Sequence, residues 1–314
     1  MRVGRAAGVT DTGRRRLRNE DAFVCEPPFF AVADGMGGAR AGEVAARLAA
    51  SALEESAPAA RGEEGVVALI VEANSRIWER ALADPATAGM GTTVTAALVD
   101  AEAGEVAIGH VGDSRAYRLR DGELAQLTTD HSLVAELVES GVLTPEEAER
   151  HPQRSAITRA LGTEPSVDVE AFTVAGQVGD LFLLCSDGLS TMIGDEEVAS
   201  AIESAGRDPV AAAEALVAAA NARGGEDNIT VVLFELDEGE PGPRESAAGS
   251  TPGGETQLPD AASHGDSTTS GTPDAAAEAI RTHGAGPGGR VAALALVVVV
   301  LVLGALALYW GIGR

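Results

Sequence analysis

Short apolar runs bounded by turn residues recur along the first part of the chain. Six of them have the length of a strand: FFAVAD (29–34), TVTAALVD (93–100), EVAIGHVG (105–112), RAYRLR (115–120), DLFLLCSD (180–187) and ITVVLFEL (229–236). Such runs are typical of β-strands. Asp121-Gly122, directly after the fourth run, is a dipeptide favoured in two-residue hairpin turns. We therefore expect antiparallel sheets whose strands pair with their sequence neighbours.

Helical periodicity appears between these runs. Apolar residues recur at the spacing of an amphipathic helix in segments 41–56, 65–83, 195–204 and 209–222. Helices mixed with antiparallel strands are typical of α+β domains, in which the helices cover the faces of the sheets. Residues 1–237 are therefore predicted to form one folded domain.

The composition changes after this domain. Residues 238–290 are rich in Gly, Pro, Ser, Thr, Ala and acidic residues and contain almost no large apolar side chain. Such a segment cannot offset its chain entropy by burying apolar surface. We therefore predict a disordered acidic linker over residues 238–290.

The last apolar segment is long enough to cross a membrane. Residues 291–310 (VAALALVVVVLVLGALALYW) carry no charge, and about twenty such residues span a hydrocarbon core of about 30 Å. Tyr309 and Trp310 end the segment with an aromatic pair typical of a membrane interface. We predict a transmembrane helix at 291–310 followed by a short tail at 311–314. A buried helix of a soluble domain is the alternative.

Charge alone does not orient this segment, because one Arg flanks each of its ends. The N-terminus lacks the apolar core of a signal peptide, and a large predicted domain precedes the helix. We therefore expect a single-pass protein of the cell membrane, with its N-terminal domain facing the cytoplasm.

Composition narrows the classes of function. The formal net charge is −25, which argues against nucleic-acid binding because that requires a basic surface. The chain contains no lysine, which excludes a lysine nucleophile, base or phosphate ligand. Cys25 and Cys185 each lie beside an apolar run and are expected to be buried thiols rather than a disulfide.

Aspartates stand where several predicted strands end or begin. Asp34 and Asp187 each end a strand and precede glycine, Asp113 follows a third strand, and Asp227 precedes a fourth. Each of them alone suits a turn, but four together indicate a shared site. Carboxylate oxygens are the ligands of hard cations such as Mg²⁺ and Mn²⁺. Two such ions can activate water for attack on a phosphate ester.

These residues belong to a longer ordered set of motifs. In order, the chain carries RLRNED (16–21), DGMGG (34–38), GTT (91–93), GDSRAY (112–117), SDG (186–188) and GEDN (225–228). The set resembles the metal-dependent serine/threonine protein phosphatases of the type 2C family, in their bacterial membrane-anchored form. The resemblance covers roughly residues 3–237. It implies an α+β four-layer sandwich of two central antiparallel sheets flanked by helices on both sides, here with one C-terminal transmembrane helix.

The resemblance also implies roles for individual residues. Asp34, Asp187 and Asp227 would hold one metal ion, with Asp34 bridging to a second ion. The Gly35 carbonyl would bind that second ion, and Glu20 would contact it through water. Asp21 would support the bridging water, and Arg16 would grip the substrate phosphate with its planar fork. Arg18 competes with Arg16 for this role. Arg14 and Arg15 are expected to be a solvated charge run.

Further residues are assigned to the edge of the site. Asp113, together with Asp187, resembles the family's weaker third metal site, and Ser155 is a candidate to join it. The segment from Thr129 to Arg154 resembles the family's mobile flap, which would select substrates, with Asp130 as a cap-like residue at its start. His151 and Arg154 lie near the end of this flap. Thr92 and Thr93 are expected to orient the site by hydrogen bonds rather than to bind metal.

One position departs from the family pattern. Some relatives carry a histidine general acid where this chain has Met36, and methionine cannot donate a proton. His110 ends a strand and is expected to be a packed core residue rather than that acid.

The predicted reaction is hydrolysis of phosphoserine and phosphothreonine on cytoplasmic proteins by a metal-activated water, with two or three Mn²⁺ or Mg²⁺ ions. Membrane Ser/Thr protein kinases and their substrates are the expected partners, with the membrane bound through the C-terminal helix and no nucleic acid bound. Two alternatives remain open. One is a catalytically silent membrane adaptor, and the other is an enzyme restricted to one phosphorylated regulator.

Overall fold

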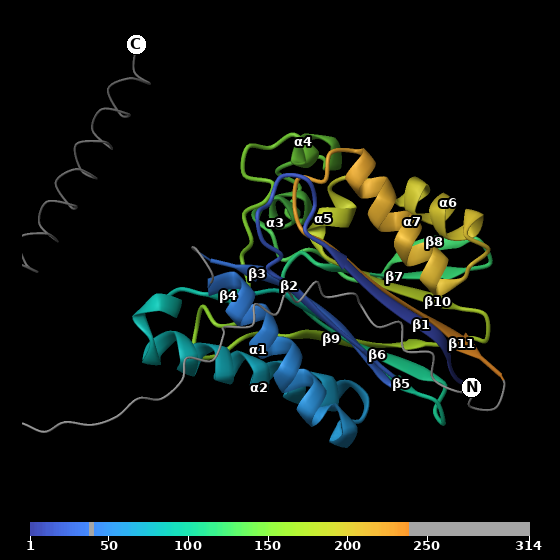
Figure 1. The fold of residues 1–314 in the computed structure, drawn as a ribbon, viewed down its shortest axis with the longest axis horizontal. Coiled ribbons are helices and arrows are strands. Elements are labelled where there is room, and N and C mark those ends of the chain that lie inside the picture. The colour runs from blue at the N-terminus through green and yellow to red at the C-terminus, as the bar shows by residue number, and fades with distance from the viewer. Residues whose placement is uncertain (38–40, 239–314) are drawn as a thin grey trace, which may run out of the picture. The chain divides into compact units, whose positions relative to one another are not determined.

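Two antiparallel sheets form the centre of the folded domain, and residues 1–37 and 41–238 of the computed structural model are described here (Figure 1). The predicted linker beyond residue 238, the predicted transmembrane helix at 291–310 and the tail at 311–314 lie outside these residues. In the described ranges, no helix is long and apolar enough to cross a membrane.

The first sheet has the strand order β1-β11-β10-β7-β8 and the second the order β2-β3-β5-β6-β9, with β4 paired to β3. The strands of the first sheet are β1 (Arg2–Asp11), β7 (Arg115–Arg120), β8 (Glu123–Gln126), β10 (Leu181–Cys185) and β11 (Ile229–Asp237). Those of the second are β2 (Asp21–Glu26), β3 (Phe29–Met36), β4 (Gly91–Thr92), β5 (Val94–Asp100), β6 (Glu105–Val111) and β9 (Glu170–Ala175).

The two sheets pack face to face through a layer of apolar side chains. Successive residues of a strand point to opposite faces, so β3 sends Phe30 toward the other sheet and Phe29 toward the helices. The ring of Phe30 stacks on Phe234 of β11 with centroids 4.1 Å apart, and Phe182 of β10 stacks on the same ring at 5.1 Å. These aromatic contacts join the sheets at their centre.

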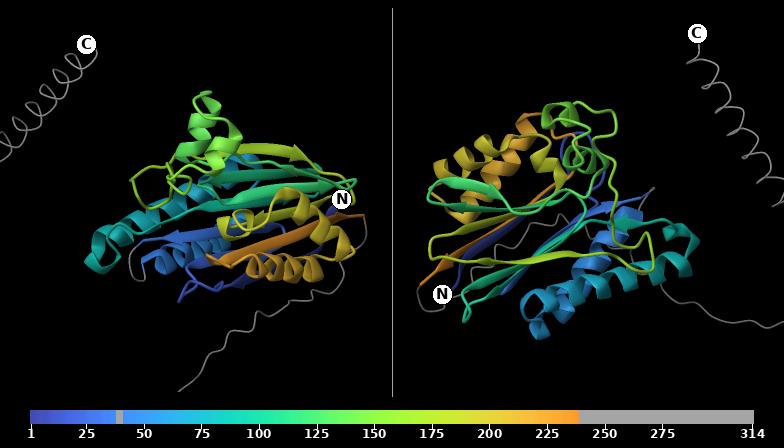
Figure 2. Two further views of the ribbon diagram at one scale, coloured as in Figure 1. Left: turned by 90° about the horizontal axis from the view of Figure 1, so that it is seen from above. Right: turned by 180° about the vertical axis from the view of Figure 1, so that it is seen from behind.

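Helices cover the outer faces of both sheets (Figure 1). The second sheet is covered by α1 (Ala41–Ser56) and α2 (Gly62–Ala83), and the first by α5 (Asp187–Ser190), α6 (Asp195–Ser204) and α7 (Pro209–Ala222). The short helices α3 (Leu133–Glu139) and α4 (Pro145–Glu149) stand apart, at the end of the domain away from the N-terminus (Figure 2). Single 3-10 turns at Ala57–Ala59 and Pro85–Thr87 complete the elements. The predicted four-layer sandwich is confirmed.

All six predicted strands and four predicted helices are present, and Asp121 and Gly122, both with positive φ, turn the chain between β7 and β8. The expectation that strands pair with sequence neighbours is only partly right, because β1 pairs with β11 and β10 with β7. Both cysteines are free thiols; Cys185 is buried as expected, whereas Cys25 is only partly buried.

Candidate metal centre

The aspartates of the motifs converge at one end of the sandwich, where strands of both sheets meet. Asp21 at the start of β2 lies opposite Asp34 near the end of β3. The first sheet approaches through Ser186 and Thr230, whose hydroxyls both donate to Oδ2 of Asp21, at 2.9 and 2.6 Å. Hydrogen bonds from one sheet thus fix a carboxylate carried by the other.

The backbone around Asp34 is held by two threonines. Thr93 Oγ1 accepts from the Asp34 N–H at 3.1 Å, and the Thr93 N–H donates to the Asp34 carbonyl at 2.9 Å. Thr92 Oγ1 donates to the same carbonyl at 2.8 Å. The prediction that Thr92 and Thr93 orient the site is confirmed.

These carboxylates are partly buried beside one another, and their negative charges repel. Burial, together with repulsion from neighbouring aspartates, raises the pKa of Asp21 to about 7 and that of Asp187 to about 6. Burial and then the charge of Asp21 raise the pKa of Asp34 well above its usual range. One oxygen of Asp21 and one of Asp187 are buried without a hydrogen-bond partner. A divalent cation bound among these oxygens would supply the missing partner and charge, so the residues fit Mn²⁺ or Mg²⁺.

Asp227 and Glu20 complete the cluster from its more exposed side. Asp227 Oδ1 accepts the N–H of Asn228 at 2.8 Å, and its Oδ2 lies 2.5 Å from an Arg16 guanidinium nitrogen. Burial raises the pKa of Glu20, against the charge of Arg16, which lowers it. Arg16 therefore lies at the mouth of the carboxylate cluster.

Gly35 follows Asp34 at a point where three backbone segments meet. A Cβ at Gly35 would lie 2.3 Å from the Gly42 carbonyl oxygen and 2.4 Å from that of Glu20. Only glycine fits such an approach. The Asp-Gly sequence therefore allows the close packing of β3 against the start of α1 and against the backbone of Glu20.

Asp113 lies in the turn between β6 and β7. Burial raises its pKa to about 7, with Asp187 and Asp130 adding repulsion. Asp130 itself accepts a two-pronged ion pair from Arg115, with both N–O distances at 2.8 Å. Ser155 is exposed in a turn after α4, and no hydrogen bond joins it to Asp113 within the described part of the chain. Its role at a third metal remains a prediction.

The predicted flap contains α3 and α4. Its cap differs from the expectation, because Ser132 and not Asp130 caps α3 by accepting from the Ala135 N–H. Asp130 lies two residues before this cap and is instead held by Arg115. His151 and Arg154 lie in the turns after α4, where Nδ1 of His151 accepts from the Gln153 N–H at 3.2 Å. No hydrogen bond or ion pair joins these two residues to the aspartates in the described ranges.

Met36 ends β3 at the rim of the site, with 37% of its surface exposed. His110, by contrast, is fully buried between Thr95 and Thr129, and burial lowers its pKa to about 3. The prediction that His110 is a packed core residue is confirmed, and neither residue supplies a general acid.

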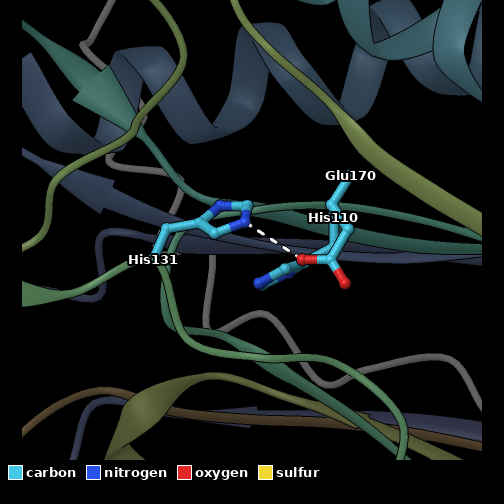
Figure 3. A group of neighbouring side chains, drawn as sticks. All are labelled: His110, His131 and Glu170. Carbon is cyan, nitrogen blue, oxygen red and sulfur yellow. Dashed lines mark hydrogen bonds and ion pairs between the residues drawn. The ribbon is translucent and has the colours of Figure 1, made fainter. Parts of the chain in front are cut away.

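A second group of potential ligands lies beside the flap and was missed from the sequence. His110, His131 and Glu170 place ligand atoms within 4.8 Å of one another (Figure 3). The Gly112 N–H donates to Nδ1 of His131 at 3.1 Å, so the ring proton lies on Nε2, which is 3.1 Å from Glu170 Oε2. Hydrogen bonds thus occupy both nitrogens of His131, and the group ties the start of the flap to β6 and β9. No spacing in the sequence reveals it.

The raised pKa values predict how stability depends on pH without metal. An aspartate has a pKa near 4 in an unfolded chain, whereas those of Asp21 and Asp113 are about 7 in the folded protein. The folded state therefore holds these protons more tightly, and stability present below about pH 4 is lost as the pH rises through about 7. In chelator, we expect the melting temperature to fall by roughly 5–10 °C between pH 5 and pH 8.

Mn²⁺ binds to ionised carboxylates, and more of the aspartates are ionised at pH 8 than at pH 5. Added Mn²⁺ should therefore raise the melting temperature more at pH 8. Calorimetry at both pH values, with chelator and with Mn²⁺, measures the two effects. A melting temperature that rises with pH in chelator would contradict the assignment.

Comparisons with known proteins agree with this geometry. The sequence model of the family described as "Protein phosphatase 2C" matches residues 12–219. Serine/threonine phosphatase stp of Listeria monocytogenes is 43% identical over 240 residues, which are 73% of this chain and 94% of that relative. Serine/threonine protein phosphatase PstP of Mycobacterium tuberculosis is 39% identical over 260 residues, which are 82% of this chain and 50% of that longer relative.

Solved structures show the same fold. The crystal structure of the Mycobacterium tuberculosis phosphatase PstP/Ppp has a TM-score of 0.70 at 40% identity, covering 75% of this chain and 100% of that one. The catalytic domain of PstP in complex with two manganese ions has a TM-score of 0.69 at 37% identity, covering 76% and 100%. The chain therefore belongs to the protein phosphatase 2C family and is a metal-dependent serine/threonine protein phosphatase.

Proposed function

We propose that Asp34, Asp187 and Asp227 hold a divalent cation, that Asp34 also reaches a second, and that the Gly35 carbonyl and Glu20 serve this second ion. The observation that carries the proposal is the group of partly buried Asp21, Asp34 and Asp187, whose pKa values are raised, with one oxygen of Asp21 and one of Asp187 left without a partner. The manganese complex of the related catalytic domain supports Mn²⁺ as the ion, and two as the number.

When bound, these ions would activate water and neutralise phosphate charge. The chain's own residues then have separable tasks. The free Oδ1 of Asp21 is placed to hold the attacking water and take up its proton, since Ser186 and Thr230 fix the other oxygen. Arg16, at the mouth of the site, binds the phosphate oxygens with its planar fork. Asp113 is the residue we assign to a weaker third ion, with Ser155 as a further candidate.

Release of phosphate from a phosphothreonine peptide tests this assignment. After removal of metal by chelator, we expect turnover to be lost and then restored by Mn²⁺ in wild type, but not in Asp34→Asn. Glu102→Gln, an exposed change in the turn between β5 and β6, is the matched control and should behave as wild type. Restored turnover in Asp34→Asn would overturn the metal assignment. Loss of Mn²⁺ binding without loss of turnover would point away from these residues as well.

We further propose that the enzyme is held at the cell membrane by residues 291–310, with its catalytic domain on the cytoplasmic side. The uncharged sequence of this segment and its terminal Tyr309 and Trp310 support the proposal. Membrane Ser/Thr kinases and their phosphorylated substrates are the partners that this placement would bring within reach. The anchor would then act by raising local concentration and would leave the chemistry unchanged.

A chain ending at residue 238 should move from the membrane fraction to the soluble fraction while keeping its kcat on a short phosphopeptide. Full-length protein that stays soluble in cells would contradict the anchor. A protease added outside intact cells should leave the catalytic domain uncut, and cleavage there would contradict the orientation.

A further inference from the structure

The loop between β1 and β2 carries the densest positive charge of the domain. Four of its residues between positions 14 and 18 are arginines, in a chain whose net charge is −25. All five residues of this arginine loop (residues 14–18) are exposed, and Leu17 is exposed over 100% of its surface. The side chains at its tip therefore project into solvent.

The backbone of the arginine loop is nevertheless fixed. The N–H groups of Arg14 and Arg15 both donate to the Gly225 carbonyl, at 2.7 and 3.2 Å. Asn228 Nδ2 donates to the carbonyl of Arg18 at 2.8 Å. Gly225 and Asn228 flank Asp227, so the loop is held at both ends by the segment that carries a metal-site carboxylate.

The charges of the loop are largely uncompensated. Arg16 pairs with Asp227, whereas Arg14, Arg15 and Arg18 make no ion pair among the described residues. Three exposed arginines without an ion pair in the described part of the chain are therefore within two residues of Arg16, to which we assign the substrate phosphate. Elsewhere the excess of carboxylates would repel an acidic substrate. A local positive surface at the site mouth reverses that effect for groups close to the phosphate.

We propose that the arginine loop is a docking surface for acidic groups that flank the phosphorylated residue of a protein substrate, namely aspartate, glutamate or a second phosphate. Guanidinium groups bind carboxylate and phosphate oxygens in a bidentate manner. The inference rests on the proposed function, because it places the substrate phosphate at Arg16. It assigns Arg14 and Arg15 to substrate selection, with no part in the chemistry.

The test compares three phosphothreonine peptides of equal length, with neutral flanks, with two flanking aspartates, and with a second phosphothreonine. The enzyme is the full chain in detergent, assayed with Mn²⁺. We expect wild type to favour the aspartate peptide over the neutral one by about three- to tenfold in kcat/KM, and the doubly phosphorylated peptide by more. Added salt should reduce this preference, because exposed charges are screened.

Arg14→Gln/Arg15→Gln keeps both backbone hydrogen bonds and removes two charges. We expect it to lower the preference below about twofold, with little change on the neutral peptide. Arg76→Gln/Arg80→Gln removes two ion-paired charges from α2, one half-buried and one exposed, and should keep the wild-type preference. Wild-type discrimination in the loop variant, or equal rates on all peptides in wild type, would overturn the proposal.

Two further results, one from peptide hydrolysis and one from binding to lipid vesicles, would also overturn the proposal. If the neutral peptide is not hydrolysed by wild type with Mn²⁺, the proposed function fails and this inference fails with it. If the loop variant loses binding to vesicles of anionic lipid while its peptide preference is unchanged, the arginine loop contacts a membrane instead, and substrate docking is overturned.

Discussion

Asp187→Asn is expected to lower phosphopeptide hydrolysis by a factor on the order of 10³ or more, since a lost metal removes several kcal/mol of transition-state stabilisation. The same change should stabilise the metal-free protein. Asp187 is partly buried, its pKa is raised to about 6, and its buried Oδ1 has no hydrogen-bond partner. An amide at this position removes one charge from a group of mutually repelling carboxylates. Activity and melting temperature in chelator should therefore change in opposite directions.

This opposition separates a functional role from a structural one. Replacing a residue that is needed only for folding would lower the activity and the stability of the protein together. Asp227→Asn should show the same loss of activity with a smaller gain in stability, because Asp227 is more exposed and already pairs with Arg16. Steady-state kinetics and calorimetry in chelator measure both quantities. Asp187→Asn with wild-type activity, or with a clearly lowered melting temperature, would contradict the assignment.

Arg16→Gln is expected to lower kcat/KM by about 10²- to 10³-fold, the range found when one donor to a developing negative charge is removed. Its guanidinium lies at the mouth of the carboxylate cluster, 2.5 Å from Asp227. Arg16→Lys should recover only part of the loss, because an ammonium group cannot form a bidentate pair with phosphate. The effect should appear on p-nitrophenyl phosphate as well as on phosphopeptides, since Arg16 would bind the phosphate that both share.

Arg18→Gln is the control, because the sequence leaves Arg16 and Arg18 as competing candidates. The structure favours Arg16: only this arginine of the loop pairs with an aspartate of the cluster. We expect Arg18→Gln to keep p-nitrophenyl phosphate hydrolysis within about threefold of wild type, the effect of an exposed charge. A large loss in Arg18→Gln with a small one in Arg16→Gln would exchange the two roles.

The elements with strong local patterns were predictable from sequence. Helix α1 spans Ala41–Ser56, as its apolar spacing predicts, and β11 follows its continuous apolar run. Strand β1 was missed because it has no such run. It contains Gly4 and Gly8, and a Cβ at Gly8 would lie 2.4 Å from the ring of Phe23. A glycine that is required for close contact with another strand adds no apolar side chain to the sequence pattern, so the strand could not be recognised from that pattern.

The order in which strands pair, and the side-chain clusters that this pairing brings together, could not be predicted from the sequence. The crossover that places β10 between β11 and β7 depends on the packing of whole layers, which short-range patterns do not encode. The pairing of β6 with β9 places Glu170 opposite His110, and the Gly112 N–H holds the ring of His131 beside them. Asp34 and Asp187 were found because they end strong strand patterns beside glycine, whereas the role of Asp21 was supplied by the family resemblance. Their burial and the unpartnered oxygens became visible only in three dimensions.

The proposed function requires divalent cations to bind among the aspartates at the junction of the two sheets. Anomalous diffraction at the manganese edge, from crystals grown with Mn²⁺, would locate such ions. We predict peaks within about 2.0–2.2 Å of carboxylate oxygens, the distance of small hard cations, with one ion between Asp34, Asp187 and Asp227. Manganese found only at His110, His131 and Glu170, or nowhere among the aspartates, would contradict the claim.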